Sequence, residues 1–127
     1  MVSKVDRIVE NTHALQDLIT KKLRELLKEV GAELDDWDIS TYGTVSDFWL
    51  IIWASKDGKP KRFEFGFSQP DIEEWEWAKS EFGVTDEELD KDEDLSSSIW
   101  WYLVLDRVAD WLGDVEAMGP EEVFRFE

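Results

Sequence analysis

The sequence contains no cysteine and a single histidine among its 127 residues. The absence of cysteine excludes disulfide bonds, thiolate nucleophiles and cysteine-ligated zinc, and it is typical of a reducing compartment. No stretch approaches the roughly 18 apolar residues of a membrane-spanning helix, and the first ten residues do not form a secretory signal. We therefore expect a cytoplasmic protein with no membrane partner.

Catalytic motifs are also missing. The sequence contains neither GxSxG nor HExxH, and no glycine-rich loop that would hold a phosphate. His13 has Glu10 and Asp17 at helical spacing on one face, an arrangement that is more typical of surface ion pairs than of a metal site. Nothing in the sequence therefore indicates a nucleophile with its base.

A calcium loop is suggested only by the alternation of Asp90, Asp92 and Asp94. The sixth position of such a loop would be Leu95, where glycine is needed, and the twelfth would be Trp101 in place of a bidentate glutamate. These two residues exclude an EF-hand. We expect no catalytic residue, no metal and no cofactor, and hence no enzyme.

Positive charge is scarce and unevenly placed. The chain has 14 Lys and Arg against 31 Asp and Glu, a net charge of −17. Residues 71–94 hold twelve carboxylates and two lysines, whereas residues 1–31 have a balance of +1. An acidic field on one part of a protein attracts basic partners and repels nucleic acid. We expect a basic partner protein and no direct nucleic-acid binding, and we interpret the four cations in residues 56–62 as protection of a hairpin tip.

The aromatic content argues for a folded chain. Eight tryptophans, seven phenylalanines and two tyrosines are more than an acidic disordered chain contains. The length and the 43% hydrophobic content suit one domain, residues 1–127. Apolar residues recur at helical spacing through residues 4–30, with Gly31 as a C-cap. The pattern predicts one long amphipathic helix at the N-terminus.

Three runs with a period near two follow, at residues 37–42, 48–54 and 62–67. Such alternation is typical of strands. Asp57 and Gly58 lie between the second and third runs and form a pair that tight hairpin turns prefer. We therefore expect the second and third strands to be antiparallel neighbours.

The second strand is apolar on both faces. One face carries the stripe Trp49, Ile51 and Trp53, and the other carries residues 48, 50 and 52. A central strand is commonly buried on both sides, so we expect helices to cover both faces of the sheet. If the stripe is exposed instead, it becomes an interface for a partner or for a second copy of the chain.

Capping patterns divide the acidic segment, residues 69–94, into two helices. Ser68, with Asp71 three residues later, is interpreted as the N-cap of the first, which ends at Gly83. Thr85 and Glu88 form a capping box for the second, residues 86–92. The outer surface of this second helix is almost entirely acidic.

The C-terminal part is predicted to supply the central core helix. Apolar residues go nearly all the way round residues 99–112, and Gly113 is placed to end the helix. Asp106 and Asp110, with Tyr102 beside them, mark a solvent stripe. The alternation in residues 121–127 predicts a fourth strand or a docked extended tail. The element order predicts an α+β fold with a three- or four-stranded antiparallel sheet, a long N-terminal helix and two to three C-terminal helices.

Acidic helices offer a way to occupy a groove that is built for DNA. Carboxylates three or four residues apart on a helix lie about 5 to 6 Å apart at Cβ, a spacing comparable with that of neighbouring phosphates along a strand. Trp77 would add a buried anchor. The candidate partner-binding residues are Asp71, Glu73, Glu74, Glu76, Trp77, Glu81, Asp86, Glu87, Glu88, Asp90, Glu93 and Asp94.

The strands around FWLIIWA and KRFEFGF and the acidic segments PDIEEWEWAKSEF and TDEELDKDED carry a resemblance in architecture and charge. In these features the chain resembles small acidic phage inhibitors, among them anti-CRISPR proteins that act as DNA mimics, and such a protein, if a phage encodes it, would lie in the host cytoplasm. The resemblance implies a non-enzymatic inhibitor that binds the basic nucleic-acid-binding surface of a bacterial defence nuclease or nuclease complex.

Other interpretations stay open. An immunity protein against a nuclease toxin would have the same acidic face, because it also blocks a nucleic-acid site. An acidic adaptor or oligomerisation domain, including a homodimer, would use the stripe Trp49, Ile51 and Trp53. A halophilic surface is disfavoured, because the chain keeps nine lysines and concentrates its acidic residues.

Overall fold

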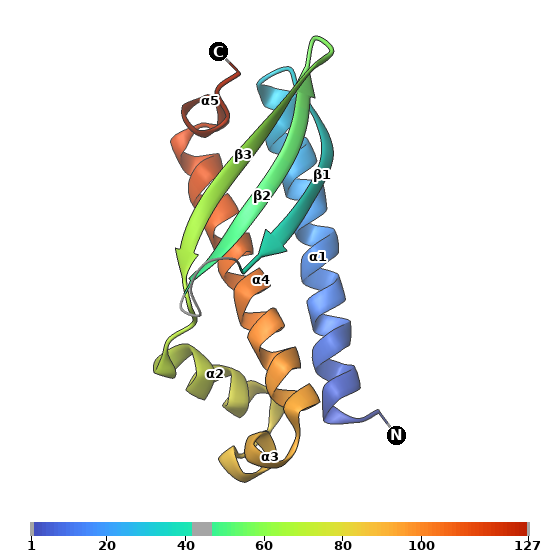
Figure 1. Cartoon of the computed structure of the whole chain (residues 1–127), viewed down its shortest axis with the longest axis vertical. Helices are drawn as coiled ribbons and strands as arrows, with labels where there is room; N and C mark the ends of the chain where they lie inside the picture. The colour runs from blue at the N-terminus through green and yellow to red at the C-terminus, as the bar shows by residue number, and fades with distance from the viewer. Residues whose placement is uncertain (1, 42–46, 127) are drawn as a thin grey trace.

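The structure is a computed structural model, and it describes residues 2–41 and 47–126. Its three strands form one antiparallel sheet in the order β1-β2-β3, and its long helices lie against one face of that sheet (Figure 1). The elements are α1 (Lys4–Glu29), β1 (Glu33–Ser40), β2 (Asp47–Lys56), β3 (Lys59–Ser68), α2 (Ile72–Phe82), α3 (Asp86–Lys91), α4 (Glu93–Met118) and α5 (Pro120–Val123). The predicted α+β fold is confirmed.

The helices α1 and α4, each of 26 residues, lie side by side and run in the same direction (Figure 1). Ion pairs tie them together at both ends: Lys4 Nζ lies 2.8 Å from Glu88 Oε2 just before α4, and Lys22 Nζ lies 3.0 Å from Glu116 Oε2. The positive ends of both helix dipoles therefore point towards the end of the molecule where α2 and α3 lie, which favours carboxylates there. No helix in the described part of the chain is long and apolar enough to cross a membrane.

Two apolar clusters make up the core, and both use α1 and α4. The larger lies between these helices and the inner face of the sheet, where Phe48, Leu50 and Ile52 are fully buried. The smaller lies beyond the sheet, where Ile8 of α1 and Phe82 of α2 pack on the first half of α4. The acidic helix α2 is thus part of the folded core.

The first strand is longer and earlier than the sequence suggested. It begins at Glu33 and ends at Ser40, and Tyr42 of the predicted strand lies outside the described residues. A bulge between Leu34 and Asp36 shifts the register with β2 and interrupts the alternation from which strands are recognised. The predicted hairpin is confirmed, because Asp57 and Gly58 have φ of 54° and 76° and join two strands in antiparallel register.

The prediction that helices cover both faces of the sheet is wrong. In Figure 1 the sheet lies in front of α1 and α4, and no helix of residues 2–41 and 47–126 crosses its outer face. Ile51 is nevertheless only 5% exposed, because Trp49 and Trp53 flank it on its own strand while Asp38 and Glu64 lie opposite it on β1 and β3. Side chains of the sheet, and not a second layer of helices, shield this residue.

The start of α2 also differs from its prediction. The N-cap is Asp71 and not Ser68: Asp71 Oδ1 accepts a hydrogen bond of 2.9 Å from the backbone N–H of Glu74, whose side chain completes a capping box. Both residues fit the cap pattern in the sequence, and only the path of the chain after β3 decides between them. The predicted capping box of Thr85 and Glu88 at α3 is confirmed.

The central helix α4 extends beyond both predicted ends. Asp92 caps it by accepting hydrogen bonds from the N–H groups of Asp94 and Leu95, so the serine-rich stretch is helical. At the other end the helix passes through Gly113. A glycine inside a helix costs about 1 kcal/mol, whereas burial of Leu112 and Val115 contributes roughly 1.5 to 3 kcal/mol each, so the helix continues.

The predicted fourth strand is wrong, and the alternative of a docked tail is closer to the structure. After the short α5, Phe124 is buried with its ring edge-on to Phe63, at a centroid distance of 5.4 Å. Phe126 packs on the same ring at 5.3 Å. The alternation therefore reflects two aromatic residues that dock on one side of the tail, without pairing to the sheet.

Candidate functional site

The beginning of α2 is fixed to α4 through one guanidinium group. Arg107 donates a hydrogen bond of 2.6 Å to the backbone carbonyl of Ser68 and forms an ion pair with Glu74. Both side chains of this ion pair are largely buried. The contact positions α2 across α4 and engages Glu74 in an ion pair within the chain.

A largely buried lysine joins α2 to α3. Lys79 is only 9% exposed, and its ammonium lies 2.6 Å from Glu76 Oε1 and also pairs with Asp86. Hydrogen bonds to the carboxylates of Asp86 and then of Glu76 raise the pKa of Lys79, so this lysine stays charged. Glu76 and Asp86 therefore neutralise an internal cation.

Glu87 and Glu88 also have partners within the chain. The ammonium of Lys4 contacts both carboxylate oxygens of Glu88 and donates a further bond of 2.6 Å to the carbonyl of Gly83. The hydrogen bond from Lys4, and after it the one from the backbone N–H of Thr85, lowers the pKa of Glu88. Lys91 pairs with Glu87 at 2.8 Å, one helical turn away.

The twelve candidate residues therefore fall into two groups. Five carboxylates are held by cations of the chain: Glu74, Glu76, Asp86, Glu87 and Glu88. The other seven are exposed and form no ion pair with any described residue: Asp71, Glu73, Trp77, Glu81, Asp90, Glu93 and Asp94. Ion pairs therefore hold five of the twelve candidate residues, although the side chains of Glu76, Asp86 and Glu87 stay 64%, 81% and 77% exposed.

The free carboxylates of α2 converge instead with two of α4. A pocket of about 440 Å³ lies between these helices, with Asp71 and Glu73 on one wall and Asp106 and Asp110 on the other. Trp77 also lines it. Five carboxylates in all line this pocket against the single guanidinium of Arg107. We call it the acidic pocket.

Trp77 is the exposed aromatic surface of the acidic pocket. Its ring is 47% exposed and stacks on Tyr102 of α4, with centroids 6.0 Å apart and an interplanar angle of 21°. Tyr102 in turn meets Phe82 edge-on at 4.9 Å. Burial, and then the neighbouring carboxylates of Asp106 and Glu81, raise the pKa of Tyr102, so its phenol stays neutral. Tyr102 therefore fixes the position of the Trp77 ring on one side, while the other side of the ring stays exposed to solvent.

The surroundings of Asp106 disfavour its ionised form. Burial first, then the charges of Asp110 and Glu74, raise its pKa above the ordinary value. Among the described residues it forms no ion pair and accepts no hydrogen bond. A cation placed in the acidic pocket would relieve this unfavourable charge.

The second candidate interface, the stripe Trp49, Ile51 and Trp53, lies on the outer face of the sheet. The ring of Trp49 lies over Gly66, where an added Cβ would come within 3.1 Å of it. Arg62 extends across Trp53, with Cζ 5.9 Å from the ring centroid. Both tryptophans are half-buried, so the stripe offers a partner only their outer edges.

Sequence reasoning missed Asp106 and Asp110 as parts of the site and interpreted them as a solvent stripe. Their four-residue spacing on an otherwise apolar helix was the available signal. What the sequence did not contain is the position of α2 over them, which leaves Tyr102 and Asp106 half-buried. No three metal-ligating side chains of the described residues are grouped to hold an ion.

Comparisons with protein-family models, curated proteins and solved structures find no match for this chain.

Proposed function

We propose that this protein is a non-enzymatic acidic inhibitor that binds the basic nucleic-acid-binding surface of a partner, with a bacterial defence nuclease as the most specific version. The observation that supports the proposal is the acidic pocket. Carboxylates from two helices meet there around an exposed, rigidly held tryptophan, and one guanidinium opposes them. Arginine and lysine side chains that normally contact phosphates would find carboxylates in their place.

The acidic pocket accounts for affinity as well as attraction. A guanidinium that enters it would pair with Asp106 or Asp110 and stack on Trp77, which combines an ion pair with a cation–π contact. Aromatic residues in desolvated sites carry a large share of binding energy at interfaces. The exposed Asp90, Glu93 and Asp94 would contribute mainly to the rate of association, through a field that salt screens.

The fold supports an acidic surface at this end of the molecule. The dipoles of α1 and α4 both present their positive ends there and offset part of the repulsion between the carboxylates. The cations Lys4, Lys79 and Arg107, which pair with carboxylates of this region, offset more. The remaining carboxylates can then be exposed without unfolding the helices that carry them.

A second candidate function is an adaptor that binds through Trp49, Ile51 and Trp53. Its support is the outer face of the sheet, which no helix covers in Figure 1. Asp36, Asp38 and Glu64 belong to the same face, so two copies would bring like charges together. This face therefore favours a basic partner over a homodimer.

The test is capture of partners from a bacterial lysate on the immobilised protein, at about 50 mM and about 500 mM salt. The proposal expects a nuclease or another nucleic-acid-binding protein that is held at low salt, lost at high salt and displaced by added duplex DNA. A toxin nuclease among the captured proteins would indicate an immunity protein. Partners whose DNA binding is unchanged by this protein would refute the inhibitor.

A matched pair of variants sharpens the experiment. Glu73→Lys with Asp110→Lys reverses charge on both walls of the acidic pocket. Glu10→Lys with Asp17→Lys makes the same change in net charge on the exposed face of α1. We expect only the first pair to abolish capture. Equal loss in both pairs would mean that the net charge, and not the acidic pocket, determines binding.

A further inference from the structure

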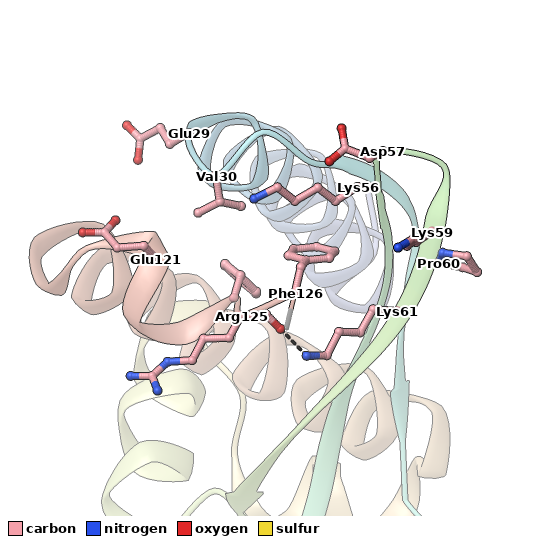
Figure 2. A pocket seen from close by; sticks show the side chains of 11 residues that line it. Glu29, Val30, Lys56, Asp57, Lys59, Pro60, Lys61, Glu121, Arg125 and Phe126 are labelled. Carbon is pink, nitrogen blue, oxygen red and sulfur yellow. Dashed lines mark hydrogen bonds between the residues drawn. The ribbon is translucent and has the colours of Figure 1, made fainter.

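A second pocket lies at the opposite end of the molecule from the acidic helices. It measures about 720 Å³ and forms where the β2–β3 hairpin meets the end of α1 and the tail after α5 (Figure 2). Three lysines of the hairpin line it: Lys56, Lys59 and Lys61. In a chain with a net charge of −17 this is a local concentration of positive charge.

The register of the hairpin brings these lysines together on one face. Lys56 lies directly opposite Lys59, and Lys61 lies opposite Ala54, on the face of the sheet towards the helices. Like charges opposite each other on paired strands are destabilising. No described carboxylate lies within 4.0 Å of any of the three ammonium groups. No ion pair within the described residues therefore offsets this repulsion.

An aromatic ring lies among the lysines. The side chains of Lys56 and Lys61 extend from the hairpin towards Phe126 in Figure 2, and Lys56 Nζ is 5.9 Å from its ring centroid. Lys61 donates a hydrogen bond to the backbone carbonyl of Arg125, which ties the tail to the hairpin. Phe126 also packs edge-on against Phe63. The ring and both ammonium groups are thus held in place around one hollow.

The acidic residues of this pocket lie at its rim. Figure 2 shows the carboxylates of Glu29 and Glu121 directed away from the Phe126 ring, and Asp57 lies at the tip of the hairpin. The C-terminal ends of α1 and α4 point to this end of the molecule, each with about half a negative charge, and offset part of the three lysines. Asp110, the residue of the acidic pocket nearest to the end of α4, lies eight residues or about 12 Å before Met118 along the helix, which is more than one screening length at physiological salt. A small anion at Lys56 and Lys61 therefore lies closer to these two ammonium groups than to the carboxylates of the acidic pocket.

We propose that this pocket binds a phosphate monoester with a flat aromatic body, the chemical class of a nucleoside 5′-monophosphate. The lysines bind the phosphate, which carries a charge of about −1.5 to −2 at neutral pH. Phe126 takes the aromatic body by stacking. The volume lies within the range of about 300 to 1,000 Å³ that is typical of small-molecule sites. A long nucleic acid is not the ligand, because its other phosphates would meet the acidic remainder of the protein.

The test is a titration of the isotope-labelled protein followed by amide NMR, with adenosine monophosphate, adenosine and inorganic phosphate as separate probes. We expect adenosine monophosphate to give saturable shifts confined to residues 56–61 and 124–126, with half-saturation below about 1 mM. Adenosine and phosphate alone should each bind at least about tenfold more weakly, because each engages only half of the site. The acidic pocket plays no part in this experiment.

Variants distinguish binding at this pocket from a general attraction of anions to positive charge. Lys56→Gln with Lys59→Gln should weaken binding by about tenfold or more, whereas Lys21→Gln with Arg24→Gln, an equal loss of charge on the exposed face of α1, should change it by less than about twofold. The single variant Lys59→Gln, at an exposed position, serves if the double variant fails to fold. No saturable shift in the native protein, equal weakening by both pairs, or phosphate bound as tightly as the nucleotide would overturn the proposal.

Discussion

Trp77 of α2 stacks on Tyr102 of α4 with the ring centroids 6.0 Å apart and the planes inclined by 21°. The stack is the aromatic contact that joins the acidic helix to the central helix at the acidic pocket. It fixes the position of Trp77 while nearly half of its surface stays exposed. A residue in this state contributes little to the core and is available to a partner.

Trp77→Ala should affect binding more than folding. Loss of the stack lowers the free energy of unfolding by about 0.5 to 1.5 kcal/mol, whereas loss of an interface anchor costs about 2 kcal/mol or more of binding energy. Calorimetric titration with a deca-arginine peptide and urea unfolding measure the two effects. Trp101→Ala is the control, since Trp101 is 39% exposed and does not line the acidic pocket. Equal weakening of peptide binding by both variants would contradict an anchor at Trp77.

Asp106→Asn should stabilise the protein at neutral pH. Burial, then Asp110 and Glu74, raise the pKa of Asp106 in the folded state above its ordinary value of 3.8. The native state therefore keeps this proton at a pH where the unfolded chain has lost it. Its contribution to stability is fully present below the unfolded pKa and is lost as pH rises through the folded one.

The gain from this substitution is small because solvent screens a half-exposed carboxylate. We expect at most about 0.5 kcal/mol at pH near 7 and no gain near pH 3. Urea unfolding at both pH values measures it, with Asp17→Asn on the exposed face of α1 as the control. A gain that is the same at both pH values would exclude relief of Asp106 as its cause.

Substitution of two adjacent isoleucines compares how tightly the two faces of the sheet are packed. Ile52 is fully buried between the sheet and the helices, and Ile51 is 5% exposed under side chains of the open face. The open face can collapse into a cavity more easily, so Ile51→Ala should cost about 2 kcal/mol and Ile52→Ala about 4 kcal/mol. Denaturant unfolding of both variants checks the difference. Equal costs would indicate that the outer face is as tightly packed as the core.

The cap of α2 distinguishes two residues that fit the same sequence pattern. Asp71→Ala should lower the free energy of unfolding by about 1 kcal/mol, because it removes the acceptor for the N–H of Glu74. Ser68→Ala should change it little, since Arg107 binds the backbone carbonyl of Ser68, which the substitution keeps. Thermal and urea unfolding of the two variants provide the measurement. A larger loss of unfolding free energy in Ser68→Ala than in Asp71→Ala would indicate that Ser68, as the sequence predicted, is the N-cap of α2.

Local signals account for the features that the sequence predicted correctly. The first helix, the turn at Asp57 and Gly58, and the capping box of Thr85 and Glu88 each depend on residues within a few positions of one another. Their outcome is largely independent of the rest of the fold. The C-terminal end of α4 was missed because burial of Val115, which depends on the core, outweighs the local preference of Gly113.

The candidate site was predicted in composition but not in arrangement. The sequence located the acidic helices and Trp77, yet it assigned Glu74 and Glu88 to the surface, where the structure pairs them with Arg107 and Lys4. These partners are far away along the chain, so no helical spacing reveals them. Asp106 was missed for the same reason, because α2 covers it only in the folded protein.

The sequence by itself determined the segregation of charge, the order of helices and strands, and most of the turns and caps, since these follow from composition and from contacts between near neighbours. Tertiary structure alone decided which carboxylates stay free, which face of the sheet remains open and which lysines meet at the hairpin. Each of these depends on side chains that are distant in sequence, and the free energy of a charge depends on what lies within a few ångströms of it.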